Sequence, residues 1–374
     1  MDLIPEAGNA SMALSPEELG YWLVLHRVMG IGPARFRALL QHFGDLRAAW
    51  EADEKAWQEA GLDRRTIRNL REARGRLHPE EELERVRRAG VTVLTWADPD
   101  YPPLLRRIPD PPPVLFLRGQ LADADRWAVA IVGTRQPTGY GREAAQWFAR
   151  ELARAGIPIV SGLARGIDAI AHEAALKAGG RTLAVLPCGL DQVYPAAHAP
   201  LAARIVEQGA LLSELPLGTR VEAGNFPARN RLISGLAVGV LVVEAGPTSG
   251  ALITAAHAAE QGREVFAIPG SIFSTASQGT NRLIRDGATP VTSPQELLEA
   301  LNWSVTARQA EVQLKLPADP VEARLLELLG REPMHIDEIA RAAGLPIAQV
   351  SSTLTVMEIK GMVRHLGAQH YIRG

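Results

Sequence analysis

The chain is poor in several features, and each shortage narrows what it can be. Its 374 residues include one cysteine, Cys188, so no intrachain disulfide and no cysteine-based zinc site can form, which predicts a reducing compartment. No run of about 18 apolar residues occurs, and the first residues lack the cationic and apolar regions of a secretory signal. The histidines show no H-x-x-x-H spacing, which predicts no metal site. We therefore expect a cytoplasmic protein without a membrane span.

Neither sign of charge is in large excess. There are 40 Lys+Arg against 42 Asp+Glu, and the formal net charge of −2 excludes an indiscriminate nucleic-acid binder, which carries a large positive excess. The net charge is −3 over residues 1–125, +1 over 126–304 and 0 over 305–374. Only four of the basic residues are lysines. Arginine suits planar phosphate and base contacts, but we attribute most of this bias to overall composition.

Two proline-rich segments, residues 99–113 and 314–320, divide the chain. Proline removes amide donors and fixes φ, which is typical of loops and linkers. The length, with 47% apolar residues, predicts two or three domains with a full core. We expect an N-terminal helical domain over residues 1–98, a middle domain over 99–304, a linker over 305–319 and a C-terminal domain over 320–374.

The middle domain alternates short apolar runs with amphipathic stretches. Buried strands are predicted over residues 127–132, 158–160, 182–186, 238–243 and 264–268. Helices are predicted over residues 142–155, 168–178, 200–208 and 251–261. Apolar strands separated by helices imply a parallel sheet covered on both sides. The fold class is therefore α/β, a Rossmann-like doubly wound and mostly parallel sheet.

The loops after the first two expected strands predict an anion site. In such sheets ligands bind where the carboxyl ends of strands meet helix N-termini. Gly133-Thr134-Arg135 begins neither G-x-G-x-x-G nor G-x-x-x-x-G-K-[ST], so the dinucleotide and NTP fingerprints are absent. Free amides, a helix dipole and an arginine nevertheless predict a phosphate cradle. The second loop contributes Ser161, Gly162, Arg165 and Gly166.

The alternative for these two loops is a pair of tight turns, with Asp168 as a helix cap. A third segment places an aromatic residue beside polar ones. Phe226 precedes Arg229, Asn230 and Arg231, in a helix that we expect to begin near Pro227. Such a composition is typical of single-strand binding surfaces, where bases stack on the ring and guanidinium groups pair with phosphates. The alternative is that the ring fills the core and the arginines form surface ion pairs.

Seven motifs follow one another across residues 126–304: VGTR, SGLARGID, LPCGLDQVYP, FPARNRLISGLA, EAGPTSGALITA, IPGSI and GTNRLIRDGA. In this order they resemble the DNA-processing protein A (DprA/Smf) family. The resemblance implies a cytoplasmic protein that binds single-stranded DNA, forms a homodimer through its Rossmann-like domain and loads a RecA-type recombinase during natural transformation. It carries these residues over as the pocket: Gly133, Thr134, Arg135, Ser161, Gly162, Arg165, Gly166, Phe226, Arg229, Asn230 and Arg231.

One departure from the family's pattern concerns the segment before Phe226. Relatives often have a basic residue there, whereas this chain has Glu222-Ala223-Gly224, so that contact is not expected. The homodimer rests on the resemblance alone. The apolar tract Val238–Ala259 suits an interface and suits a buried core equally well.

The flanking domains resemble known modules. The Gly30-x-Gly32 turn, followed by Leu39-Leu40 and Phe43-Gly44, is similar to a helix-hairpin-helix, although the net charge of −3 favours a packing, SAM-like role over DNA contact. Expected helices over 321–329, 336–343 and 346–360, with a wing over 362–372, resemble a winged helix. Its third helix offers only Lys360 as a cation, where duplex binding needs several phosphate contacts, so we favour a protein-contact or vestigial role.

An enzyme is the less favoured interpretation. No G-x-S-x-G nucleophile elbow occurs, and one cysteine excludes a zinc deaminase arrangement. The glycine-rich segment 246–250 resembles the loop of nucleotide phosphoribohydrolases but lacks the acidic residue of their PGGxGTxxE signature. We therefore expect a binding protein without enzymatic activity or cofactor. The alternative is a nucleotide-ligand-binding sensor or phosphoribohydrolase-like enzyme on the same fold.

Overall fold

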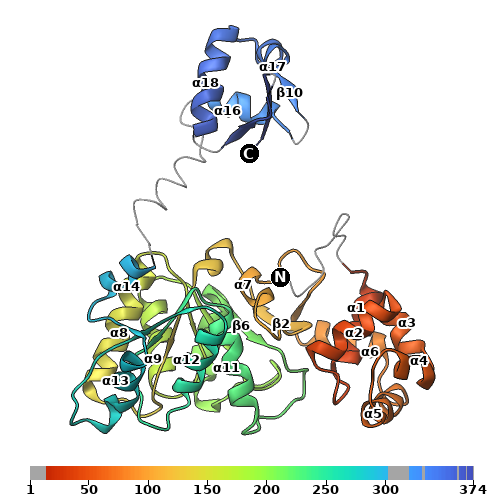
Figure 1. Cartoon of the computed structure of the whole chain (residues 1–374), viewed down its shortest axis with the longest axis vertical. Helices are drawn as coiled ribbons and strands as arrows, with labels where there is room; N and C mark the ends of the chain where they lie inside the picture. The colour runs from red at the N-terminus through yellow and green to blue at the C-terminus, as the bar shows by residue number, and fades with distance from the viewer. Residues whose placement is uncertain (1–13, 302–319, 331–332, 360–361, 368, 374) are drawn as a thin grey trace. The chain divides into compact units, whose positions relative to one another are not determined.

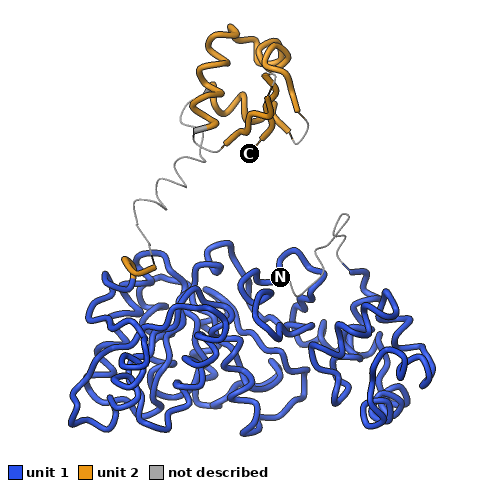
Figure 2. Tube along the Cα trace, in the orientation of Figure 1, with its two compact units in different colours: residues 1–297 blue, residues 298–374 orange. Residues whose placement is uncertain are grey.

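The structure is a computed structural model that describes residues 14–301, 320–330, 333–359, 362–367 and 369–373 (Figure 1). The chain divides into two compact units, residues 1–297 and 298–374 (Figure 2). The expected linker over 305–319 lies outside the described residues, and the domain boundaries stay predictions. Within the described part, no helix is long and apolar enough to cross a membrane.

The first unit opens with a series of short helices. These are α1 (Pro16–His26), α2 (Pro33–Phe43), α3 (Leu46–Glu51), α4 (Glu54–Glu59), α5 (Arg64–Arg74) and α6 (Pro79–Arg88). Oxygen-bearing side chains begin several of them: Asp45, Asp53 and Asp63 accept a backbone amide at the starts of α3, α4 and α5. The turn between α1 and α2 lies where the helix-hairpin-helix pattern predicts it.

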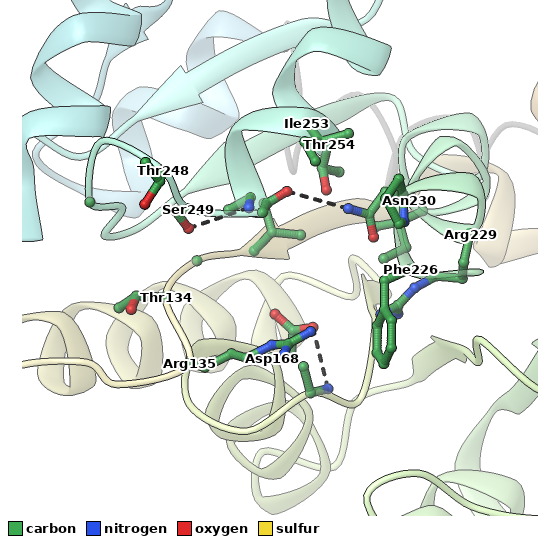
Figure 3. A pocket seen from close by; sticks show the side chains of 18 of the residues that line it. Thr134, Arg135, Asp168, Phe226, Arg229, Asn230, Thr248, Ser249, Ile253 and Thr254 are labelled. Atoms are coloured by element: carbon green, nitrogen blue, oxygen red, sulfur yellow. Dashed lines mark hydrogen bonds between the residues drawn. The ribbon is translucent and has the colours of Figure 1, made fainter. Parts of the chain in front are cut away.

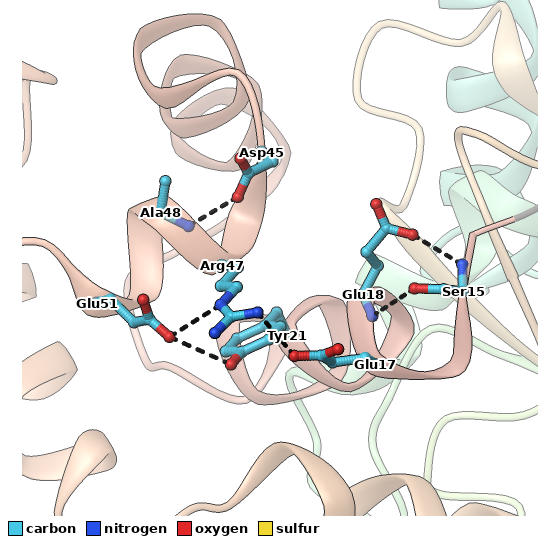
Figure 4. Close-up of polar contacts among 8 residues, drawn as sticks. All are labelled: Ser15, Glu17, Glu18, Tyr21, Asp45, Arg47, Ala48 and Glu51. Atoms are coloured by element: carbon cyan, nitrogen blue, oxygen red, sulfur yellow. Dashed lines mark hydrogen bonds and ion pairs between the residues drawn. The ribbon is translucent and has the colours of Figure 1, made fainter.

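Polar contacts on the surface align α1 with α3 (Figure 4). Ser15 and Glu18 form a reciprocal capping box at the start of α1. Arg47 on α3 donates to Glu17 at 2.8 Å and to Glu51 at 3.1 Å. All three of these ion-pairing side chains are more than half exposed, so each pair adds at most about 1 kcal/mol. Stability here comes from the core instead.

Aromatic packing joins the helices to the sheet. Trp22 of α1 lies 5.0 Å from Phe36 and 6.3 Å from Trp96, measured between ring centroids. His26 approaches Phe116 of the sheet in the same way, at 6.0 Å. One cluster of buried apolar residues runs from Trp22 through the sheet to Ala258. The helical segment and the sheet therefore share a core.

The sheet has nine strands: β1 (Thr92–Thr95), β2 (Val114–Gly119), β3 (Val129–Val132), β4 (Ile159–Ser161), β5 (Thr182–Val185), β6 (Ala210–Ser213), β7 (Gly239–Val242), β8 (Glu264–Ala267) and β9 (Thr289–Pro290). Their order is β1-β2-β6-β5-β4-β3-β7-β8-β9. β3 to β9 pair in parallel, whereas β1, β2 and β6 are joined by antiparallel pairing. The predicted α/β class with a mostly parallel sheet is confirmed.

Helices follow the strands of the sheet: α7 (Pro103–Arg106), α8 (Gly139–Arg154), α9 (Ile167–Lys177), α10 (Ala199–Gln208), α11 (Asn225–Gly235), α12 (Ala251–Glu260), α13 (Gln278–Arg285) and α14 (Pro294–Ala300). From β3 the chain adds strands in one direction to β6, and from β7 it adds them in the other. Right-handed crossovers then place α8, α9 and α10 on one face and α12 on the opposite face. The reversal lies between β3 and β7.

The five predicted strands and four predicted helices of this domain all form, with shifted ends. α8 begins three residues before the predicted start because the Thr138 hydroxyl caps it by accepting from the Gly141 amide. α11 begins at Asn225, so Pro227 falls in its first turn, where a missing amide does no harm. The strands β1, β2, β6 and β9 were not predicted, and each of them is only two to six residues long.

The second unit folds as a small winged helix. It contains α16 (Pro320–Leu328), β10 (Met334–His335), α17 (Ile336–Ala343), α18 (Ile347–Ile359), β11 (Val363–His365) and β12 (His370–Arg373). The strands form a sheet of order β10-β12-β11. Leu325, Ile339 and Leu354, one from each helix, are fully buried in its core. The predicted three helices and wing are confirmed, although Lys360 lies outside the described residues.

The chain segments that begin β5 and β6 lie very close to each other, and this contact can be tested by substitution. Gly209, before β6, lies so near Thr182 that a Cβ would overlap the Thr182 carbonyl oxygen. Gly209→Ala should therefore lower the free energy of unfolding by roughly 1–3 kcal/mol. Gly139→Ala is the matched control, since a Cβ there meets no atom within 4 Å. Urea unfolding measures both, and equal midpoints for the two variants would contradict the packing described.

Candidate functional site

A pocket of about 690 Å³ opens at the reversal of strand order between β3 and β7 (Figure 3). Ligands of doubly wound sheets bind at this position. The loops after β3, β4 and β7 line it, together with the first turns of α11 and α12. Six of the predicted site residues line this pocket: Gly133, Thr134, Arg135, Phe226, Arg229 and Asn230. The other five do not line it.

Phe226 is held at the pocket between two partners. The Arg135 guanidinium lies over its ring, 5.0 Å from the centroid. Tyr194 meets the ring edge-on, with 5.5 Å between centroids. Phe226 is half-buried and Arg135 is exposed, and among the described residues Arg135 makes no hydrogen bond or ion pair. The predicted alternative, in which Phe226 fills the core, is wrong because its ring lines the pocket.

Arg229 occupies the floor of the pocket. It is 5% exposed and its Nη1 donates to the Val185 carbonyl oxygen at 2.6 Å. Its guanidinium packs against Gly162, where a Cβ would overlap it, and this explains the glycine at that position. Burial lowers the pKa of Arg229 to about 10, so the group stays charged at neutral pH. Its Nε is buried without a hydrogen-bond partner.

Arg231 does not belong to the site, which corrects its predicted role as a phosphate clamp. Its side chain is buried on the other side of α11, where it forms ion pairs with Glu214 and, at 3.0 Å, with Asp110. Both carboxylates hold this buried guanidinium away from the pocket, which Arg231 does not line, so it is not placed to bind a phosphate there. Arg231 instead anchors α11 to the loops that carry these acids.

The remaining predicted residues support the loop after β4. Ser161 is buried and its hydroxyl donates to the Ile131 carbonyl at 2.6 Å, so it joins neighbouring strands. Gly166 has φ +81° and begins α9, a conformation that favours glycine. Arg165 is exposed, with no hydrogen bond or ion pair in the described part of the chain, and it lies next to the pocket-lining Ala164. Only Arg165 among these three can reach a ligand.

The predicted phosphate cradle at the start of α8 is partly occupied by Glu244. The buried Glu244 carboxylate accepts from the Thr138 amide at 2.8 Å and from the Thr138 hydroxyl at 2.7 Å. The Glu244 carbonyl accepts from the Thr134 amide at 2.7 Å. The amides of Thr134 and Thr138 are therefore already bound by Glu244, which leaves fewer free amides in this loop than the sequence predicts.

The loop after β4 shows the same arrangement. Asp168 is 7% exposed and accepts from the Gly162 amide at 3.2 Å and the Ala164 amide at 3.4 Å. Burial raises the pKa of Asp168, while Arg229 opposes that rise. The alternative in which Asp168 is a helix cap is wrong, because Gly166 is the N-cap of α9 and Asp168 accepts amides of the preceding loop instead. Because Asp168 also lines the pocket, its carboxyl faces any ligand there.

Hydroxyls of the loop before α12 complete the wall. Thr248 and Ser249 line the pocket, and Asn230 donates from its amide to the Gly250 carbonyl at 3.3 Å, which ties α11 to α12. The buried Ile233 and the exposed Ile253 add apolar surface to the lining of the pocket. Of these lining residues, only Asn230 was among the predicted site residues. The Gly-Pro-Thr-Ser-Gly run was a signal for the others, because it is typical of a loop at a helix start. No cluster of three metal-ligating side chains occurs among the described residues.

Three family models match most of the chain. Models described as DNA recombination-mediator protein A, DprA winged helix domain and DprA-like N-terminal HHH domain match residues 92–302, 306–369 and 16–75. The chain is 38% identical to Protein Smf of Synechocystis, over 96% of this chain and 100% of that protein. It is 44% identical to Protein Smf of Escherichia coli, over 70% of this chain and 72% of that protein.

Two solved structures are similar as well. The X-ray structure of DNA processing protein A from Streptococcus pneumoniae has a TM-score of 0.66 and 34% identity, and the match covers 77% of this chain and 98% of that one. A structure of the Helicobacter pylori protein, described for its unique single-stranded DNA binding mode, has a TM-score of 0.51 and 33% identity, with 56% and 95% covered. The resemblance read from the seven motifs is confirmed: this chain belongs to the DNA recombination-mediator protein A family.

Proposed function

We propose that this protein binds single-stranded DNA in the pocket between α11, α12 and the loop after β3, and that it does so without catalysing a reaction. One observation carries the proposal: the Phe226 ring lines the pocket under the guanidinium of Arg135, which has no acidic partner among the described residues. An aromatic face beside an unpaired cation is the arrangement that binds a base and its phosphate together.

The geometry suggests how a strand would bind. Tyr194 meets Phe226 edge-on, which holds the ring and leaves its faces for stacking. A base takes the face that Arg135 covers in the free protein, and the guanidinium moves to the neighbouring phosphate. Arg165, exposed at the rim, pairs with a second phosphate. Thr248 and Ser249 offer hydroxyls to the backbone from the opposite wall.

The alternative, a nucleotide sensor or phosphoribohydrolase-like enzyme, is disfavoured by the filled loops. Such a protein needs free amides at a helix N-terminus for its ligand's phosphates. Here Glu244 and Asp168 accept the amides of both candidate loops. The similarity to the Helicobacter pylori protein, described for its single-stranded DNA binding mode, supports the polymer as ligand.

The wider role follows from the family. We propose that the chain acts in the cytoplasm as a homodimer formed through its Rossmann-like domain and loads a RecA-type recombinase on incoming single-stranded DNA during natural transformation. Membership of a family described as recombination mediators supports this role. Half of the residues in the tract Val238–Ala259 are buried, including all of β7, so the tract as a whole does not form the proposed dimer surface.

Removal of the ring tests the pocket. Phe226→Ala should weaken binding to a labelled dT oligomer by about 1–3 kcal/mol, because base stacking on the aromatic face is lost. Fluorescence anisotropy measures the affinity, and Phe226→Trp should retain most of it. If Phe226→Ala binds as tightly as the wild type, the pocket is not the site.

The arginines predict a modest dependence on salt. Arg135→Ala should weaken binding and reduce the slope of log K against log salt concentration by about 0.7, the value for one single-strand phosphate contact. Arg204→Ala is the matched control, since Arg204 is exposed on α10 and does not line the pocket. An unchanged slope for Arg135→Ala would show that its guanidinium contacts no phosphate.

A competition titration separates polymer from mononucleotide. A dT oligomer should displace a bound labelled oligomer at a far lower concentration of nucleotide than dTMP does, because several contacts act on one strand. The nucleotide-sensor alternative predicts the reverse, with dTMP saturating the site and length adding nothing.

Sedimentation and a loading assay test the wider role. The full chain should sediment as a dimer at micromolar concentration. It should also speed the assembly of a RecA-type recombinase on single-stranded DNA, and Phe226→Ala should slow that assembly in proportion to its lost DNA affinity. A monomer at all concentrations would contradict the dimer, and an unchanged assembly rate with wild-type protein would contradict the loading role.

A further inference from the structure

Two backbone anion sites at the carboxyl edge of the sheet are occupied by the chain's own carboxylates. Glu244, two residues after the end of β7, is 2% exposed and accepts the Thr138 amide and hydroxyl at the start of the 16-residue helix α8. Asp168 accepts the amides of Gly162 and Ala164. Both acids therefore sit where the phosphate of a bound nucleotide lies in other doubly wound proteins.

The role of Glu244 goes beyond capping the start of α8. α8 already has a cap, because the Thr138 hydroxyl accepts from the Gly141 amide at 3.2 Å. A buried carboxylate costs desolvation free energy, and a neutral side chain would satisfy Thr138 equally well. Gly141 leaves room for the carboxylate, since a Cβ at that position would overlap it. The negative charge itself is thus the property that a cap does not explain.

The loop after β4 repeats the arrangement independently. Leu163 has φ +57°, a conformation that only a few per cent of non-glycine residues adopt, and it lies between the two amides that converge on Asp168. Successive amides turned in this way form an anion-binding concavity. The concavity opens at the pocket, where Asp168 is a lining residue, and Asp168 fills it.

Charge then distinguishes two kinds of ligand that carry the same bases. A phosphate monoester, the terminal group of a free nucleotide, carries about −1.5 to −2 charges at neutral pH and binds best to converging amides. A phosphodiester in a strand carries one charge and can be held by side chains. Here the amides of Thr138, Gly162 and Ala164 are bound by Glu244 and Asp168, and the exposed cations Arg135 and Arg165 remain at the rim.

We propose that Glu244 and Asp168 are specificity-determining residues that exclude free nucleoside phosphates from the pocket and so reserve it for the polymer. The inference rests on the proposed single-stranded DNA site. The inference extends the proposed function, because it assigns a role to two acids that are not proposed to contact a DNA phosphate. The excluded class comprises nucleoside monophosphates and triphosphates, whose terminal phosphates would compete with the carboxylates for the same amides.

The test uses the full chain with ATP, dTMP and a dT oligomer as probes. Glu244→Gln keeps the shape and hydrogen bonding of the side chain and removes its charge, whereas Glu244→Ala also opens space beside Thr138. Isothermal titration should show ATP and dTMP binding about tenfold or more tighter to both variants, because like-charge repulsion is relieved. The dT-oligomer affinity of Glu244→Gln should change far less than its nucleotide affinity, because the retained hydrogen bonds to Thr138 keep the loop after β3 in place. Glu244→Ala loses these bonds and should bind the oligomer more weakly. Glu143→Gln, on the exposed side of α8, is the matched control and should change nothing.

Asp168→Asn tests the second loop separately and should also increase nucleotide affinity, which keeps the proposal falsifiable if the Glu244 variants fail to fold. Thermal unfolding establishes that each variant is native. Folded Glu244 and Asp168 variants that bind ATP and dTMP no better than the wild type would overturn the proposal. Loss of dT binding without a gain in nucleotide binding would also overturn it. Failure of the wild type to bind dT would instead refute the single-stranded DNA site, so the two failures are distinguishable.

Discussion

Glu244 holds together the two halves of the doubly wound sheet where the functional pocket opens. Its carbonyl accepts from the Thr134 amide, and its carboxylate accepts from the Thr138 amide and hydroxyl. These contacts join the end of β7 to the loop after β3, across the reversal of strand order. The position of that loop sets the position of Arg135, and Arg135 lies over Phe226. The geometry of the pocket therefore depends on a buried acid that does not line it.

Two buried arginines hold α11, the helix that carries Phe226, against the sheet and its loops. Arg229 donates to Val185 at the end of β5, and Arg231 pairs with Glu214 and Asp110 from two separate loops. Removing one partner of such a buried pair leaves an uncompensated charge, at a cost of about 3–5 kcal/mol. α11 is thereby held to the sheet, and an aromatic platform needs such support to present its ring in one orientation. Arg229 and Arg231, which follow Phe226 in sequence, thus support its helix, whereas the cation over the ring is Arg135 from the loop after β3.

The sequence predicted the architecture because strand and helix periods are local. Each strand and helix predicted for the Rossmann-like domain formed. The strand β6 was not predicted, because its apolar run is only three residues long, Ala210 to Leu212. Six of the eleven site residues line the pocket for the same reason: strand ends bring their loops together. Arg231 could not be assigned correctly, because its partner Asp110 lies far away in the chain and only tertiary packing brings the two together. Likewise, nothing local shows that the amides after β3 are already bound by Glu244.

The charge distribution places a limit on how strongly one pocket can bind. Of the arginines at the site, Arg229 is buried beside the acidic Asp168, and only Arg135 and Arg165 are exposed without partners in the described chain. On the proposed function, one ring and two free cations hold a short stretch of strand with modest affinity and a small dependence on salt. Joining two such pockets on one strand makes the second binding event intramolecular, which raises the overall affinity without any new contact. On this proposal, a nearly neutral protein that binds the strand through one small pocket per subunit gains selectivity for long single strands by pairing its pockets, which gives the proposed homodimer a physical reason.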